Sequence, residues 1–180
     1  MHTLHWISTE AESVQDAFDN IKTILEKSPE GGNVADWSDW HVVGGGRWNE
    51  VGDGYTDQSN MIVSYKDNAE KFKEVLSDIK KYRTTYLNRK LSSIDNAFEK
   101  LKVDIVDYIS NGCDLPPKQE WDFSRYDIKD CIAMLGSEWT PESGFFDSQE
   151  YTSKIKYLEE RLDNSDKAAL QYLVPVDFHF

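Results

Sequence analysis

Residues 37–48 have the sequence Trp37-Ser-Asp-Trp-His-Val-Val-Gly-Gly-Gly-Arg-Trp48, which holds three of the six tryptophans and three of the ten glycines of the chain. Side chains from Trp40 to Val43 would alternate as in a short strand. The three glycines that follow allow positive φ angles and a close approach of the backbone to a neighbouring segment. We therefore expect a strand that ends in a tight turn.

Strand-like and helical periods continue on both sides of this stretch. Residues 2–8 predict a first strand, and Ser13 with Asp16 predicts a capped helix that ends before Pro29. Residues 61–65 predict a third strand that forms a hairpin with residues 40–43. We expect residues 113–129 to be irregular because of Pro116-Pro117, and the last elements to be a hairpin at 130–140, a helix at 148–162 and a strand at 171–180.

The longest helical pattern covers residues 67–110. Apolar side chains recur there at steps of three and four from Phe72 to Ile109. A single helix of this length would reach about 60 Å at ~1.5 Å per residue, which exceeds the diameter of a body of this size. We expect either two helices, broken near residues 88–92 before a new cap at Ser92-Ser93, or one helix that projects from the body.

These elements predict an α+β fold of the ferredoxin-like kind, with a mostly antiparallel sheet, helices on one face and a long helical insertion at about 67–110. The first and last strands would be adjacent at the centre of the sheet. Pro175 conflicts with a central last strand, because a proline has no N–H for the ladder and favours an edge or a bulge. We expect residues 1–180 to form a single domain, in which residues 67–110 are a helical segment that could project from the body.

The charge of the chain restricts its partners. The formal net charge is −13, which disfavours non-specific binding to nucleic acid or to an anionic membrane and makes direct DNA binding a poor expectation. Residues 66–102 are mildly basic, whereas both flanks are acidic. We expect a cytoplasmic protein without membrane contact, for three reasons. The two cysteines have no metal-ligand spacing, the first residues do not resemble a secretory signal, and no apolar run is long enough to span a bilayer.

The sequence contains none of the common catalytic, phosphate-binding or metal-binding motifs. If the first and last strands pair, His5 and His179 could approach each other, with Asp177 on the same strand face as His179. A metal or acid–base site could be built from these three residues, but strand histidines are more often surface or half-buried groups. The sequence therefore favours a protein without a catalytic, metal or cofactor site.

The glycine turn is the one cluster for which a ligand is a physical expectation. Glycine N–H groups can face an anion, the Arg47 guanidinium can bind phosphate or carboxylate, and the indoles can stack a base. The alternative is a bulged turn, with Arg47 paired to an acid such as Asp39 and the tryptophans in the core. The candidate ligand-binding residues are Trp37, Trp40, His41, Gly44, Gly45, Gly46, Arg47 and Trp48.

A basic run lies on the long helical segment and consists of Lys80, Lys81, Arg83, Arg89 and Lys90. It could contact nucleic acid or an acidic partner, but the solvated side of an amphipathic helix is the more frequent role of such a run. The apolar stripe on the same segment would belong to the core. If the helix projects, part of this stripe is exposed and becomes a surface for a partner or for a second copy of the chain.

Three segments together resemble a known group of proteins. Residues 37–48 resemble the Trp-x-x-(Ile/Val)-Gly-Gly-Arg-Trp box of small uncharacterised proteins from tailed bacteriophages and prophages, although this chain has a third glycine and His41 before the valines. Residues 133–139 are similar to their second hairpin, and residues 172–179 to their terminal Val-Asp-aromatic-His strand. The resemblance implies a viral accessory protein inside a host cell, and it implies no activity.

The first functional hypothesis is a non-catalytic phage-type protein that inhibits or redirects a host defence or nucleic-acid-handling system through protein contact. Its acidic flanks would bind a host protein with a basic surface, and DNA mimicry is one form of such contact. The alternative is a protein that sequesters a nucleotide signal at the Gly-Gly-Gly-Arg-Trp turn. A nucleotide-modifying enzyme that uses His5, Asp177 and His179 is the third hypothesis.

Overall fold

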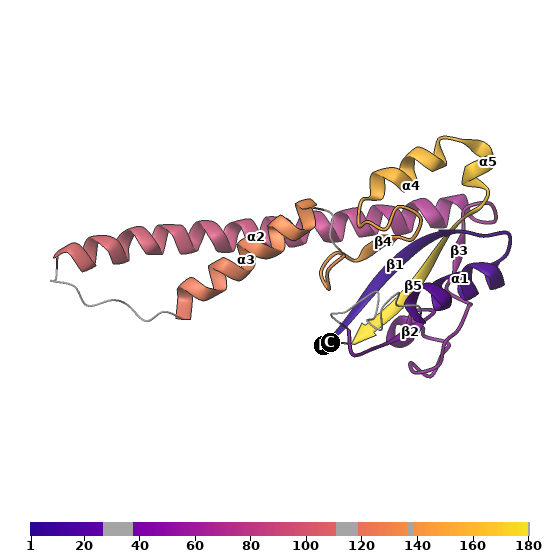
Figure 1. Cartoon of the computed structure of the whole chain (residues 1–180), viewed down its shortest axis with the longest axis horizontal. Helices are drawn as coiled ribbons and strands as arrows, with labels where there is room; N and C mark the ends of the chain where they lie inside the picture. Colours follow the sequence, from indigo (N-terminus) through magenta and orange to yellow (C-terminus); the bar gives the residue numbers. More distant parts are fainter. Residues whose placement is uncertain (27–37, 111–118, 137–138, 180) are drawn as a thin grey trace.

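A computed structural model describes residues 1–26, 38–110, 119–136 and 139–179. The strands are β1 (His2–Glu10), β2 (Trp40–Val43), β3 (Val63–Ser64), β4 (Phe145–Asp147) and β5 (Gln171–His179). The α-helices are α1 (Val14–Glu26), α2 (Ala69–Ser110), α3 (Gln119–Gly136), α4 (Ile155–Leu162) and α5 (Ser165–Ala168), and a short 3-10 helix, η1, covers Gly46–Trp48. The strands form one sheet at one end of an elongated molecule, and α2 and α3 extend away from it (Figure 1).

The sheet has the order β2-β5-β1-β4, and β3 pairs with β5 beside the end of β2. β1 and β5 are antiparallel along their full length, with His2 opposite His179 and Glu10 opposite Gln171. β2 and β3 are also antiparallel to β5, whereas β4 is parallel to β1. The predicted α+β class, the mostly antiparallel sheet and the central pairing of the first and last strands are therefore confirmed.

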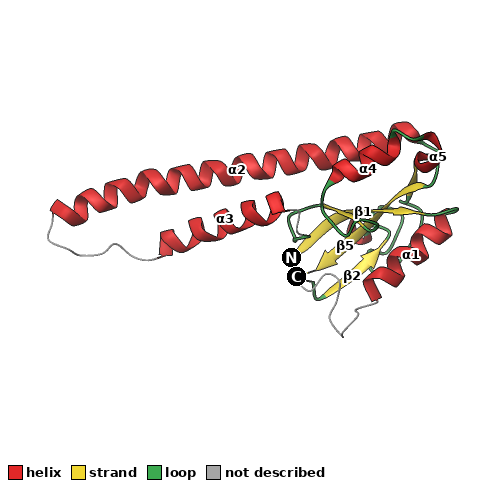
Figure 2. Ribbon diagram, turned by 45° about the horizontal axis from the view of Figure 1, so that its top comes forward, coloured by secondary structure: helices red, strands yellow, loops and turns green. Residues whose placement is uncertain are grey.

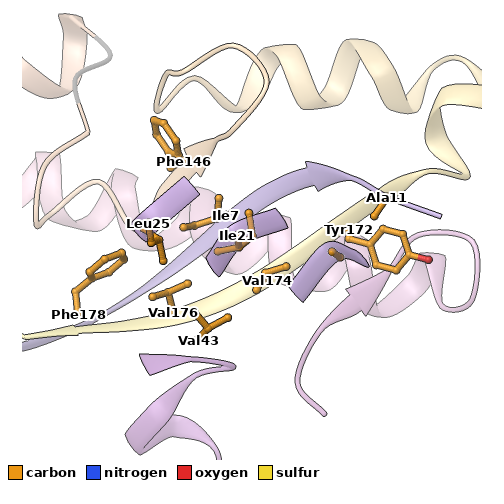
Figure 3. Packing of buried hydrophobic residues seen from close by; sticks show 11 residues of the cluster. Ile7, Ala11, Ile21, Leu25, Val43, Phe146, Tyr172, Val174, Val176 and Phe178 are labelled. Carbon is orange, nitrogen blue, oxygen red and sulfur yellow. The ribbon is translucent and has the colours of Figure 1, made fainter. Parts of the chain in front are cut away.

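Helices cover both faces of the sheet, so the expectation that they share one face is wrong. On one face, α1 packs against alternate residues of the central strands, in a core that includes Ile7, Ile21, Val174 and Val176 (Figure 3). On the other face, α2 and α4 pack against the intervening residues. The physical reason is that β5 has apolar side chains on both of its faces, so helices must cover both faces of the sheet to bury them.

α2 is one unbroken helix, so the predicted long helical segment is present and the break near residues 88–92 is not. The two serines that suggested a new cap have other partners. The Ser92 hydroxyl donates to the Asn88 carbonyl one turn earlier at 3.1 Å, and the Ser93 hydroxyl donates to Asp127 of α3 at 2.7 Å. The first third of α2 covers the sheet, and its distal part projects from the body with α3 beside it (Figures 1 and 2).

Three further expectations are corrected. β2 and β3 do not form a hairpin, because both pair with β5. Residues 119–136 form the helix α3, although the sequence predicts an irregular stretch at 113–129 and a hairpin at 130–140. Residues 113–118 and 137–138 of these two stretches lie outside the described chain. The last long helix begins at Ile155, because the Asp147 carboxylate accepts the N–H groups of Gln149 and Glu150 at 3.0 and 3.2 Å and holds a turn there.

Pro175 lies inside the central strand β5 and not at an edge. Its carbonyl accepts the N–H groups of Gly44 and Gly45 at 2.7 and 3.0 Å, on the side of β5 where β2 ends and β3 begins. In an antiparallel ladder the N–H and the carbonyl of one residue point to the same neighbour. An N–H at position 175 would therefore face the gap between β2 and β3, so the proline causes no loss of a ladder hydrogen bond.

Candidate functional site

The glycine turn is built for close backbone contact. Gly44, Gly45 and Gly46 have φ angles of 97°, 92° and 46°, which other residues rarely adopt. A Cβ on Gly44 would lie 1.7 Å from the Gln58 carbonyl oxygen, and one on Gly46 would lie 2.6 Å from the Asp177 side chain. The sequence therefore needs glycine at these positions to fit the turn between β5 and residues 58–61.

Five of the six N–H groups of residues 44–49 have an acceptor within the described chain. Gly44 and Gly45 donate to Pro175, and the Arg47 N–H donates to Oδ2 of Asp177 at 3.1 Å. The N–H groups of Trp48 and Asn49 donate to the carbonyls of Gly45 and Gly46. The buried Asp177 carboxylate thus takes the position that an external anion would take, so a ligand at this turn would meet side chains and not a backbone cradle.

The candidate side chains of residues 37–48 have different environments. The Arg47 guanidinium is exposed and has no partner among the described residues, and Trp48 is 40% exposed. Trp40 is stacked on His179, with ring centroids 5.2 Å apart. His41 is half-buried, and this partial burial lowers its pKa. Trp37 lies outside the described residues. Arg47 is therefore not paired with Asp39, which lies near His179.

The pairing of β1 with β5 brings His2, and not His5, to Asp177 and His179. Oδ1 of Asp177 accepts from Nδ1 of His2 at 2.9 Å, and the rings of His2 and His179 lie 4.9 Å apart. Nδ1 of His179 is 3.4 Å from the Asp39 carboxylate. Asp177 lies opposite Leu4, so the side chain of His5 points to the other face of the sheet. The metal or acid–base site that His5, Asp177 and His179 could have formed is not present, because His5 lies on the other face of the sheet.

His5 is a structural residue of the core. Its Nε2–H donates to the Pro141 carbonyl at 3.0 Å, and its Nδ1 accepts the Trp139 indole N–H at 2.8 Å. Burial lowers its pKa to about 4, so the ring is neutral at physiological pH. Both ring nitrogens are used, which leaves His5 as the link between β1 and the segment that precedes β4.

A pocket of about 400 Å³ lies beside Trp48, between the end of the sheet and the first third of α2. β1 contributes His2, Leu4 and Trp6, alternate residues that share the face toward α2. α2 contributes Asp78 and Tyr82, and the backbone at Gly144 closes one side. Among the candidate residues that the structure describes, only Trp48 lines this pocket. No local motif marks the others, because they come from segments far apart in the chain.

The basic run on α2 is used inside the molecule. Lys80 pairs with Glu159 of α4, and Nζ of Lys90 lies between Asp127 and Asp130 of α3, 3.0 Å from the latter. The Arg83 guanidinium donates to the Ser153 carbonyl at 2.5 Å. Arg89 lies over the ring of Tyr86, at 5.5 Å from its centroid. Most of the positive charge of this run therefore fixes α2 to its neighbours.

The distal half of α2 and part of α3 carry large apolar side chains that are exposed. Leu91 and Phe98 lie two turns apart on the same side of α2, and they are 53% and 50% exposed. Ile109, near the end of α2, is 73% exposed. Tyr126 and Ile132 are exposed on α3. We call these five residues the arm surface. Exposed apolar groups gathered on one projection are a frequent feature of protein-binding surfaces.

Two further properties concern the described residues alone. They contain no group of three or more His, Cys, Asp or Glu side chains arranged to hold a metal ion. Among them, no helix is both long enough and apolar enough to cross a bilayer. No family model, curated protein or solved structure matches this chain.

Proposed function

We propose that this chain is a non-catalytic, phage-type accessory protein that binds a host protein through the arm surface and thereby inhibits or redirects a host defence or nucleic-acid-handling system. The observation that supports contact through the arm is the exposure of Leu91, Phe98 and Ile109 on a helix that projects from the body. The resemblance of residues 37–48 to a box of tailed-phage proteins supports the host-directed part of the proposal.

The energetics favour a surface that is covered in the cell. An apolar side chain contributes about 1.5–3 kcal/mol when it is transferred from water into an interface, and aromatic residues frequently anchor such interfaces. Phe98 lies near the middle of the arm surface, between Leu91 and Ile109, and is its natural anchor. Lys90 and its partners Asp127 and Asp130 fix α3 against α2, so the arm would meet a partner as a pre-formed helix pair.

The charge of the body supports a partner with a basic surface. Exposed carboxylates lie on α1 and just before it, at Glu12, Asp16, Asp19 and Glu26. Lys80 and Lys90 of α2 are paired with carboxylates of α4 and α3. An acidic body would attract a basic host protein over long range, and the arm would supply the apolar contact.

The test compares two variants that each add one negative charge to an exposed position of α2. Phe98→Glu removes the anchor, and Asn96→Glu is the matched control, since residues two apart project from different sides of a helix. Tagged wild-type chain and both variants are passed through a bacterial lysate, and captured proteins are identified by mass spectrometry. We expect one host protein that the wild type and Asn96→Glu retain and that Phe98→Glu loses.

A second copy of the chain is the competing occupant of the arm surface. Light scattering of the purified chain measures this directly. A monomer that captures a host protein agrees with the proposal. A dimer that Phe98→Glu converts to a monomer would assign the arm surface to self-association and contradict the proposal.

A further inference from the structure

The pocket between the sheet end and α2 has aromatic walls from three separate elements: Trp6 of β1, Trp48 of η1 and Tyr82 of α2. Trp48 and Tyr82 remain 40% and 45% exposed, so their rings are accessible to a ligand. Gly144 has a φ of 63°, and a Cβ there would lie 3.2 Å from the ring of Tyr82. The backbone at Gly144 therefore limits the movement of this ring on one side.

The charge in the pocket is negative. The Asp78 carboxylate has neither a hydrogen-bond partner nor an ion-pair partner in the part of the chain that the structure describes. None of the described residues that line the pocket is a lysine or an arginine. The Nδ1 of His2 is directed to the buried Asp177 carboxylate at 2.9 Å. A phosphate or a carboxylate in this pocket would meet Asp78 without a lining Lys or Arg to balance it.

We propose that this pocket binds a small organic cation, a quaternary or methylated ammonium group. The faces of Trp, Tyr and Phe rings attract a cation, and methyl groups on the nitrogen replace its contacts with water by contacts with the rings. Asp78 supplies the opposite charge at the mouth, on a chain whose net charge is −13. This site is distinct from the arm surface and does not depend on the proposed function.

The test uses two probes of nearly equal shape, choline and its uncharged carbon analogue 3,3-dimethylbutan-1-ol, with binding followed by tryptophan fluorescence and calorimetry. We expect choline to bind about tenfold tighter than the uncharged analogue, because only the cation gains from the ring faces and from Asp78. Adenosine monophosphate is the third probe. It tests a nucleotide at the same pocket with its phosphate at Arg47.

Variants locate the site. Trp48→Leu and Tyr82→Leu each change a partly exposed side chain, and each is expected to weaken choline binding about tenfold. Asp78→Asn should weaken it several-fold. The controls are Tyr55→Leu, an exposed aromatic residue outside the pocket, and Glu70→Gln, an exposed carboxylate at the start of α2, and both should leave choline binding unchanged.

Three outcomes would overturn the proposal. Equal binding of choline and the uncharged analogue would make the pocket a purely apolar site. Tighter binding of adenosine monophosphate, lost in Arg47→Ala, would make it an anion site. Failure of choline to bind to the wild-type chain, or binding that Trp48→Leu and Tyr82→Leu leave unchanged, would remove the pocket as a cation site.

Discussion

Arg47 and Asp177 are joined by a hydrogen bond of 3.1 Å from the backbone N–H of Arg47 to Oδ2 of the buried Asp177 carboxylate. The other oxygen of this carboxylate accepts from His2, so one side chain of β5 ties η1 to β1. The guanidinium of Arg47 takes no part in this contact and remains exposed. The most distinctive turn of the sequence is thus organised by an acid that lies 130 residues later in the chain.

Replacement of this acid should destabilise the fold. Asp177→Ala leaves the N–H groups of Arg47 and His2 without their acceptor at a site that is closed to water. We expect a loss of roughly 2–4 kcal/mol in the free energy of unfolding, measured by urea denaturation. Asp39→Ala is the control, because its carboxylate is largely exposed, and should change stability by less than about 0.5 kcal/mol. Equal losses would mean that Asp177 has no special role.

The glycine turn can be tested with two substitutions that impose the same backbone strain. Gly44 and Gly54 have φ angles of 97° and 80°, so an alanine at either position costs about 1 kcal/mol from backbone conformation. Only at Gly44 would the new Cβ also meet a backbone oxygen, that of Gln58. We expect thermal denaturation to show Gly44→Ala as less stable than Gly54→Ala by at least about 2 kcal/mol. Similar stabilities would contradict the close packing at this turn.

How much of this structure the sequence could predict depends on the range of the contacts. α1, α2 and the central strands follow from periods that lie within each segment. β3 lies within the strand predicted at residues 61–65, but its pairing with β5 leaves no local pattern, and β4 is only three residues long. The sequence does not predict α3, because the prolines at 116 and 117 favour irregular structure around them, whereas α3 begins only at Gln119.

The same limit applies to the candidate sites. The three glycines at 44–46 predict the turn from the sequence alone, because the backbone conformation that glycine allows is a local property. Asp78 and Tyr82 fit an ordinary helical pattern, and Trp6 fits an ordinary strand. Their convergence on one pocket depends on how α2 lies across the sheet, which no single segment encodes. The role of His2 has no local signal for the same reason, since only the register of β1 against β5 places it, and not His5, beside Asp177.

The buried His5 should make stability depend on pH. Burial lowers its pKa from 6.5 to about 4 in the folded chain. Above pH 6.5 the ring is neutral in both states and contributes no pH dependence. Between pH 6.5 and 4 the unfolded chain takes up a proton that the folded chain refuses, so stability falls as the pH falls, by up to about 3 kcal/mol.

Urea denaturation at pH 6.5, 5.5 and 4.5 isolates this effect when the wild type is compared with His5→Gln, which does not titrate. We expect the unfolding free energy of the wild type to decrease more steeply than that of the variant, by about 1 kcal/mol per pH unit. Parallel curves would show that the His5 ring is protonated without penalty in the folded chain.

The contact of Lys90 with Asp127 and Asp130, here called the Lys90 clasp, should control the attachment of α3 to α2. Burial disfavours the charged form of Lys90, but its hydrogen bonds to Asp127 and Asp130 outweigh burial and raise its pKa. Lys90→Met removes these bonds, and we expect the amides of α3 to exchange with deuterium about five- to tenfold faster, as for a loss of ~1 kcal/mol. Lys102→Met is the matched control, because Lys102 pairs with Glu99 on the same exposed helix. It should leave α3 exchange unchanged, and an equal acceleration in both variants would argue against the clasp.

The central claim, that the arm surface binds a host protein, is tested most directly by deuterium exchange of the chain alone and in complex with the captured partner. We predict that protection will increase at residues 91–109 of α2 and 126–132 of α3, where the exposed apolar side chains lie. Protection confined to the sheet end or to α1, with no change along the arm, would contradict the claim.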